Sequence, residues 1–267
     1  MKKILTVAHN TFIESIRDRV LYSLIFFALI MIASSLVLST ISAEQYNKIV
    51  KDFGLTAISI FGILLSIFLG IGLVYKEIEK KTVYNIFSKP IQRYQFILGK
   101  YLGLSLTILI ITLAMSLILF LIVLYIELSN KDFIVYYYGG LYFKELLLAI
   151  YFQFLEFLIV IGIALVLSSF TTPVIAILLS FLVFTMGRFS GDIRLFAEEI
   201  KNPITNIFSE FLYRVIPNLE KFDFRSEAVY GGKISLSLVF YTSAYAVIYI
   251  LLLLFISIII FEKREFK

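Results

Sequence analysis

The sequence predicts an all-α integral membrane protein, and three observations lead to that fold class. The chain of 267 residues is 60% hydrophobic and 16% charged, whereas a soluble domain is about 45–50% apolar and about 25% charged. Its apolar residues gather into segments near the length of about 20 residues that a helix needs to cross the hydrocarbon core. Its cations concentrate on alternate connections between those segments. One membrane domain over residues 1–267 is therefore expected.

Six segments are predicted to cross the membrane as helices. The fifth is the shortest and needs a few flanking residues to span the hydrocarbon core. In approximate bounds the segments are Val20–Ile41, Phe53–Tyr75, Leu98–Ile126, Leu146–Phe170, Pro173–Met186 and Leu236–Phe261. An even number of spans places both termini on the same side of the membrane.

The distribution of positive charge predicts the direction of insertion, because cytoplasmic loops carry an excess of Lys and Arg. With the N-terminus inside, 13 cations lie on the cytoplasmic side and 4 on the two short external loops. The long loop Arg188–Lys233 adds 7 cations and 7 acids, which weakens the asymmetry without reversing it. We expect a multi-pass protein of the cell inner (cytoplasmic) membrane with both termini cytoplasmic. The net charge of +5 suits anionic lipid headgroups beside the spans rather than nucleic acid.

Residues 1–19 are predicted to form an amphipathic helix lying in the membrane interface before the first span. Glu14, Arg17 and Asp18 occupy its polar side. The alternative is a simple membrane-proximal extension. The apolar residues at helical spacing are Ile4, Leu5, Ala8, Phe12, Ile16 and Val20.

Residues 76–97 connect the second and third spans and are predicted to form two helical pieces beneath the membrane. Pro90 breaks the first piece, and Lys89 is pushed toward extended geometry because it precedes a proline. Ser88 can cap the second piece, which runs from Ile91 into the third span. Each piece is continuous with a span, so a push on either one reaches the membrane. The alternative is an ordinary short loop that carries positive charge.

The external loop 188–235 is predicted to hold one or two helices on, or dipping into, the outer leaflet. Asn202 is a suitable N-cap with Pro203 at the first helical position, and Pro217 ends the segment. A weaker helical stretch precedes it over Ile193–Ile200. The apolar stripe of the main helix is Ile204, Ile207, Phe208, Phe211, Leu212 and Val215.

Small residues recur at a spacing of four on two of the predicted spans. Gly62, Ser66 and Gly70 form one such row, and Gly99 and Gly103 begin another. Rows of this kind let helix backbones approach closely in lipid. Their partner can be a helix of the same chain or of a second copy.

The sequence contains no recognisable catalytic or nucleotide-binding motif. It has no Cys and a single His, His9, so a Cys- or His-based metal site is not expected. Gly99-Lys100 is not followed by Ser or Thr and has no glycine five residues before it, so it is not a phosphate-binding loop. We therefore predict that the chain is not an enzyme and binds no cofactor or metal itself.

One acidic residue, Glu156, lies clearly inside a predicted span, with Gln153 one turn earlier. An ionisable group at such a position is costly and is a functional candidate by default. Glu156 could line a transport pathway or carry a proton. The alternative is a neutral Glu that is hydrogen-bonded to a neighbouring helix.

The stretch "KEIEKKTVYNIFSKPIQRYQFILGKYLG" closely resembles the permease subunits of ABC type-2 (exporter-type) transporters. Further segments resemble the same family: "LSSFTTPVIAILLSFLVFTMGRFSGDI", "VIPNLEKFDFRS" and the C-terminal "FEKREFK". The most similar subgroup contains the nitrous oxide reductase maturation permease. Val83-Tyr84-Asn85 departs from the usual Leu-Glu of the family. The residues in register are Thr82, Ser88, Pro90, Arg93, Gly99, Lys100 and Gly103.

The resemblance implies a mechanism and a set of partners. Two six-span permeases pair, as a homodimer or heterodimer, and two ATP-binding cassette ATPase subunits dock below them. ATP with Mg²⁺ is then bound by the partner subunit. A cytoplasmic coupling helix between spans two and three fits a groove on the ATPase and passes its motion to the membrane. The implied coupling residues are Glu77, Glu79, Thr82, Ile86, Phe87, Ser88, Pro90 and Arg93.

Two functions remain open, with a membrane-embedded enzyme as a distant third. The first is export of a solute driven by the partner ATPase; the lack of an ordered polar lining on the spans mildly favours an apolar or amphipathic cargo. The second is mechanical work by the same fold on an external maturation or assembly factor, contacted around Ile204–Val215, without solute transport.

Overall fold

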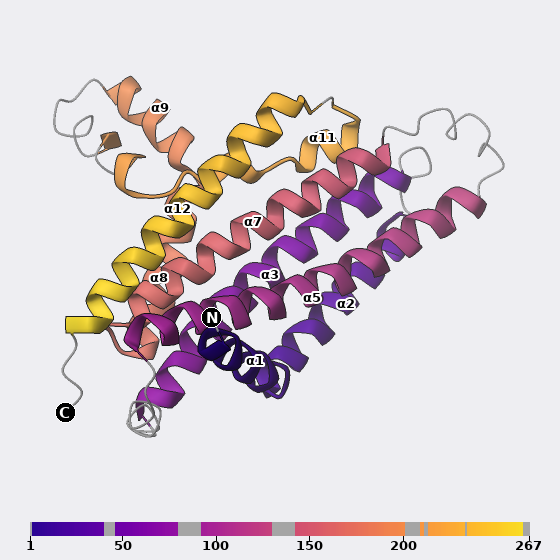
Figure 1. The fold of residues 1–267 in the computed structure, drawn as a ribbon. Coiled ribbons are helices and arrows are strands. Elements are labelled where there is room, and N and C mark those ends of the chain that lie inside the picture. The colour runs from indigo at the N-terminus through magenta and orange to yellow at the C-terminus, as the bar shows by residue number, and fades with distance from the viewer. Residues whose placement is uncertain are drawn as a thin grey trace.

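The computed structural model describes residues 2–39, 46–79, 92–129, 142–200, 209–210, 213–232 and 234–263. Within these ranges the chain forms helices and no strand. Figure 1 shows the long helices running side by side as a bundle. Together with the apolar character of these helices, this confirms the predicted fold class, an all-α integral membrane protein.

Among the helices that the structure describes, five are long and apolar enough to cross a membrane. Each corresponds to one predicted span and extends beyond the expected bounds at one or both ends, because polar residues continue the helical pattern past the apolar run. Two predicted ends differ: α7 ends at Ser168, two residues before the expected Phe170, and the expected end of the first span at Ile41 lies outside the described residues. These helices are α2 (Arg19–Ser39), α3 (Tyr46–Glu79), α5 (Arg93–Ser129), α7 (Tyr142–Ser168) and α12 (Leu236–Lys263).

The segment predicted as the fifth span forms a shorter helix, α8 (Pro173–Arg188). Pro173 occupies its first turn, as expected for a residue that lacks an N–H donor. At about 1.5 Å per residue, its 16 residues extend about 24 Å, less than the hydrocarbon core of about 30 Å. The six-span count therefore stays a prediction.

The first helix, α1 (Lys2–Ile16), packs across α5. Gly103 permits the approach, because a Cβ added there would lie 2.7 Å from the Cβ of Thr11. Thr11 and Ser15 are the buried residues of α1, whereas Leu5 and Ile16 of the expected apolar row are exposed. The row that begins at Gly99 thus contacts a helix of the same chain.

The break between the first two helices lies slightly earlier than expected. The interfacial helix, predicted over residues 1–19, ends at Ile16, and α2 begins at Arg19, one residue before the predicted start of the first span at Val20. The side chain of Asp18 accepts a hydrogen bond from the backbone N–H of Val20 at 3.0 Å. This contact satisfies one of the free N–H groups in the first turn of α2.

Helices α3 and α7 pack against each other at the centre of the bundle and are its most buried spans. The second small-residue row faces this contact. The Phe157 ring of α7 fills the space beside Gly62, and Ala164 of α7 lies beside Gly70. Both predicted rows therefore bring together helices of one chain.

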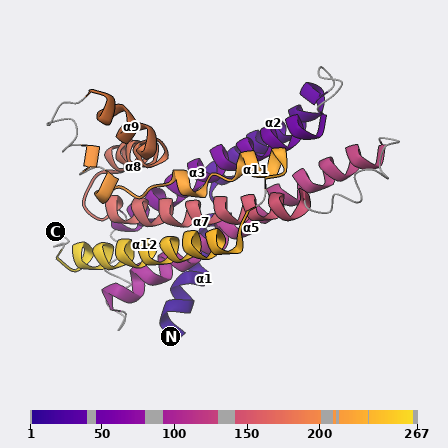
Figure 2. The same cartoon turned by 90° about the horizontal axis from the view of Figure 1, so that it is seen from above.

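The end of α3, the start of α5 and the end of α12 lie toward one end of the bundle, at the lower left of Figure 1, and α1 packs against α5. Figure 2 shows α8 on one side of α7 and α1 on the other. The end of α2, the start of α3, the end of α5 and the start of α7 lie at the opposite end of the bundle.

After α8 the chain forms α9 (Ser190–Ile200), the 3-10 turn η1 (Glu220–Phe222) and α11 (Arg225–Tyr230). We call residues 217–230 the return segment, because they lead back along the bundle and pack against α3 and α7. Most of the helix predicted around Ile204–Val215 lies outside the described residues. Part of the predicted external loop is thus docked onto the spans.

Candidate functional site

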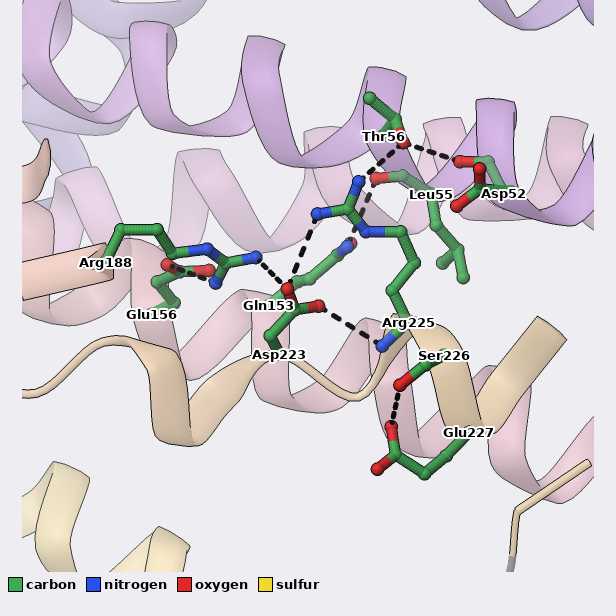
Figure 3. Close-up of polar contacts among 10 residues, drawn as sticks. All are labelled: Asp52, Leu55, Thr56, Gln153, Glu156, Arg188, Asp223, Arg225, Ser226 and Glu227. Carbon is green, nitrogen blue, oxygen red and sulfur yellow. Dashed lines mark hydrogen bonds and ion pairs between the residues drawn. The ribbon is translucent and has the colours of Figure 1, made fainter. Parts of the chain in front are cut away.

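A cluster of charged side chains lies where the end of α8 meets α7 and the return segment (Figure 3). Glu156 of α7 is completely buried, and its Oε1 accepts a hydrogen bond from Nη1 of Arg188 at 3.1 Å. The other terminal nitrogen of Arg188 donates to Oδ2 of Asp223 at 2.6 Å. One guanidinium therefore bridges a buried acid on a span and an acid on the return segment.

A second arginine extends this cluster to α3. Nη2 of Arg225 lies 3.6 Å from Oδ2 of Asp223, and Nη1 of Arg225 donates to the hydroxyl of Thr56 at 2.8 Å. The same hydroxyl donates to the carbonyl of Asp52 at 2.7 Å. We call Glu156, Arg188, Asp223, Arg225 and Thr56 the polar cluster; it joins α3, α7, α8 and the return segment.

The local backbone explains why these groups meet. The N–H of Leu219 donates to the carbonyl of Gly187 at 3.0 Å, directly beside Arg188. A Cβ at Gly187 would lie 2.6 Å from the carbonyl oxygen of Pro217, so only glycine permits this approach without displacement. The end of α8 and the start of the return segment are consequently held in contact.

The four charges of the polar cluster balance, with two carboxylates and two guanidinium groups. Burial differs strongly among them: the side-chain exposure is 0% for Glu156, 17% for Arg188, 27% for Arg225 and 35% for Asp223. Buried ionised groups need a partner because they have lost water. Glu156 therefore depends on Arg188 more strongly than Asp223 does.

Within the described part of the chain, Gln153 and Glu156, one turn apart on α7, each keep one open acceptor atom. The amide nitrogen of Gln153 donates to the carbonyl of Leu55 on α3 at 3.1 Å. The Gln153 Oε1 and Glu156 Oε2 atoms are buried and accept no hydrogen bond from the residues that the structure describes. Glu156, predicted as a possible pathway residue, thus has a cationic partner on α8; its role in a pathway stays a prediction.

The predicted coupling residues fall mainly outside the described residues. This is the case for Thr82, Ile86, Phe87, Ser88 and Pro90. Glu77 and Glu79 belong to the last turns of α3. Arg93 is described in full and begins α5.

The guanidinium of Arg93 holds the end of another span. Its Nη1 donates to the carbonyl of Phe261 at 3.3 Å and to the carbonyl of Glu262. These belong to the last turn of α12, where carbonyls have no partner within the helix. The Phe96 and Phe261 rings stack beside them with centroids 5.4 Å apart. Arg93 therefore joins the start of α5 to the end of α12.

A buried lysine lies near the same end of the bundle. Lys100 of α5 is 1% exposed, and its ammonium lies 3.4 Å from Oε2 of Glu14 on α1, which is 41% exposed. The ammonium also lies 5.8 Å from the centroid of the Phe96 ring. This ion pair supports the close packing of α1 on α5 at Gly99 and Gly103.

An apolar groove of about 640 Å³ lies between α3 and α8. Its lining includes Leu64 and Phe68 of α3 and Phe181 and Met186 of α8. The groove offers a surface for apolar groups. Within the described ranges, no group of three or more His, Asp or Glu side chains is arranged to hold a metal ion.

Sequence reasoning found Glu156 but missed its partners. Arg188 and Asp223 were counted as residues of the external loop 188–235. The length of the fifth apolar segment carried a signal that could have placed Arg188. Fourteen residues, Pro173–Met186, extend only about 21 Å as a helix, so the residue that follows them can lie at the depth of a buried acid.

Comparison with known proteins agrees with this architecture. No curated protein matches the chain. A family model described as "ABC-2 family transporter protein" matches residues 5–266, nearly the whole length. Proteins of this family are membrane components of transporters, and the particular subgroup stays a prediction. The chain therefore belongs to the ABC-2 family of transporter proteins, as a multi-pass membrane permease component.

Proposed function

We propose that the chain is the membrane-spanning permease subunit of an ABC exporter and couples ATP hydrolysis by a separate ATPase subunit to transmembrane export. The observation that carries the proposal is the junction at Arg93. This residue lies two residues from the edge of the undescribed stretch 80–91 and holds the end of α12. A displacement of residues 80–92 would therefore act on α3 and α5 through the chain and on α12 through Arg93.

This arrangement suits a lever that converts motion at one face of the membrane into motion of several spans. The helices α3 and α5 are continuous through 34 and 37 residues, so they transmit a push along their length without an intervening loop. α1 is packed onto the first turns of α5 and would move with it. The subunit expected to move residues 80–92 is an ATP-binding cassette ATPase on the cytoplasmic side.

The remaining elements of the proposal follow from the same orientation. Both termini and residues 80–92 are placed on the cytoplasmic side of the inner membrane, as the cation distribution predicts. A second permease copy, identical or related, completes the complex. The groove between α3 and α8 is lined almost entirely by apolar side chains, which supports an apolar or amphipathic cargo.

The role of Arg93 is testable in the complex of this chain with its ATPase subunit, reconstituted in nanodiscs. Arg93→Ala removes hydrogen bonds from a charged donor to the two α12 carbonyls. Because each such bond contributes about 1.5–3 kcal/mol, we expect permease-dependent stimulation of ATP hydrolysis to fall about tenfold while the ATPase subunit stays bound. Arg93→Lys should be intermediate, since an ammonium lacks the planar fork of a guanidinium.

The matched control is Arg17→Ala, which removes an exposed arginine from the turn between α1 and α2. We expect it to leave stimulation unchanged. Stimulation retained in full by Arg93→Ala would contradict the lever. Loss of the ATPase subunit from Arg93→Ala alone would instead assign Arg93 to the docking surface.

A second function is favoured by one observation: the return segment is attached directly to α3 and α7. Motion of these spans could thereby be passed to an external maturation or assembly factor without solute transport. Transport assays in vesicles, run beside pull-downs on residues 188–235, separate the two functions. Binding of an external protein with no ATP-dependent solute movement would favour the second.

A further inference from the structure

We propose that the return segment is a latch, which docks on the bundle and releases from it as a unit, and that the Arg188–Asp223 ion pair closes it. Docking would depend on how α3, α7 and α8 are placed relative to one another. The latch itself does not require an ATPase; only its response to nucleotide rests on the function proposed above.

The first argument is the way in which the charges divide. Glu156 and Arg188 are paired on the bundle side, across α7 and α8. Asp223 and Arg225 are paired within the return segment, where the N–H of Arg225 also donates to Oδ1 of Asp223 at 3.3 Å. If the Arg188–Asp223 contact opens, each side keeps one acid and one base. Undocking therefore leaves no carboxylate or guanidinium without an opposite charge.

This division distinguishes a latch from a permanent support. Breaking a buried ion pair is strongly unfavourable when it leaves one partner alone in a low-dielectric interior. Here the hydrogen bonds of charged side chains that cross from the return segment to α3 and α8 are the ion pair Arg188–Asp223 and the bond Arg225–Thr56. Both involve side chains that are partly exposed, so water can replace these two polar contacts as the segment moves. The rest of the contact is largely apolar, with Phe222 and Phe224 buried.

The second argument is that docking of the return segment depends on the relative positions of several helices. Arg225 reaches α3 through Thr56, and Phe224 stacks on Phe152 of α7 with ring centroids 4.2 Å apart. Arg188 belongs to α8. All three contacts form only when α3, α7 and the end of α8 are close together. A change in spacing between α3 and α8 would strain the polar contacts first, because hydrogen bonds tolerate little displacement.

The third argument is that the segment is attached at both of its ends. At its start, the N–H of Asn218 donates to the hydroxyl of Tyr245 on α12 at 2.9 Å, beside the backbone contact at Gly187. At its end, the chain turns at Gly231, which adopts a left-handed conformation with φ of 77° that glycine accepts without strain, shortly before α12 begins at Leu236. The part between these points, residues 220–230, can move while both ends stay attached.

The latch is tested through the exposure of a residue that docking covers. Ala228 of α11 is fully buried, and the chain has no native cysteine, so Ala228→Cys provides a single thiol. Its labelling rate with a membrane-impermeant maleimide is measured on the purified permease in nanodiscs. Adding Asp223→Asn should raise the rate about tenfold, the factor expected when one charge-assisted hydrogen bond is lost from the docked state.

Two controls make the result specific. Glu227→Gln neutralises a second carboxylate of the return segment, which accepts a hydrogen bond from the neighbouring Ser226 hydroxyl; it should change the rate less than twofold, as expected for a surface substitution. Ala28→Cys, fully buried on α2, should stay unlabelled with and without Asp223→Asn. An unchanged rate at Ala228→Cys overturns the latch. Labelling of both cysteines also overturns it, since the contact would then be a permanent support of the fold.

The nucleotide response is measured separately on the complex with the ATPase subunit. The labelling rate of Ala228→Cys is compared without nucleotide and with ATP plus vanadate. A difference of about tenfold would show that the latch follows the ATPase cycle, as expected for an element that shifts between two states. A nucleotide-independent rate, found together with a faster rate in Asp223→Asn, would keep the latch and reject its coupling to the ATPase.

Discussion

The dependence of Glu156 on Arg188 gives the sharpest prediction for stability. Arg188→Gln removes the guanidinium from a carboxylate that is 0% exposed and lies 3.1 Å from it. Breaking a buried pair in this way costs about 3–5 kcal/mol. Glu156→Gln is the matched change of the other partner. It leaves Arg188, which is 17% exposed, on Asp223 at 2.6 Å, and should cost about 1 kcal/mol.

The assay is the free energy of unfolding, from denaturant titration in mixed micelles followed by the helical circular dichroism signal. Arg188→Gln should be less stable than Glu156→Gln by about 2–4 kcal/mol. The double variant Glu156→Gln/Arg188→Gln should recover part of the loss, since it carries no lone buried charge. Equal costs for the two single variants, or a double variant whose loss is their sum, would refute the reasoning.

Two further predictions concern packing and topology. Gly103→Ala places a Cβ 2.7 Å from a side-chain carbon of α1, and this overpacking should lower the free energy of unfolding by about 1–3 kcal/mol. Gly72→Ala has nothing within 4 Å of the added Cβ and should be neutral or stabilising by up to about 1 kcal/mol. Equal effects of the two changes in the same titration would argue against the α1–α5 contact. Single cysteines at Lys89, Asn130 and Gly232 should react with an impermeant maleimide from the inside, outside and outside, and labelling of Lys89 from outside would reverse the orientation.

The long spans could be predicted because the bilayer imposes a length and a polarity that are visible in one sequence. The 14 apolar residues of Pro173–Met186 were less informative. Whether such a helix crosses the bilayer or stops inside the bundle depends on what meets its end. Here that partner is the backbone near Leu219, more than thirty residues later in the chain.

The sequence could not predict which helices and which charged side chains contact one another. Gly99 and Gly103 indicated a close helix approach, but not that α1 would be the approaching helix. Arg93 fits the family pattern for the coupling region, yet its described contacts are with α12. Glu156 was conspicuous as an acid in an apolar run, while Arg188 looked like an ordinary loop cation. Such pairings depend on how the helices pack, which periodicity does not encode.

The most direct test of the proposed function is affinity purification of the chain from its native membranes in mild detergent, with ATP hydrolysis measured in the eluate. The account predicts that an ATP-binding cassette subunit is retained with the chain and that its hydrolysis changes when Arg93 is replaced by Ala. Recovery of the chain without an ATP-hydrolysing subunit, under conditions that preserve the folded bundle, would contradict it.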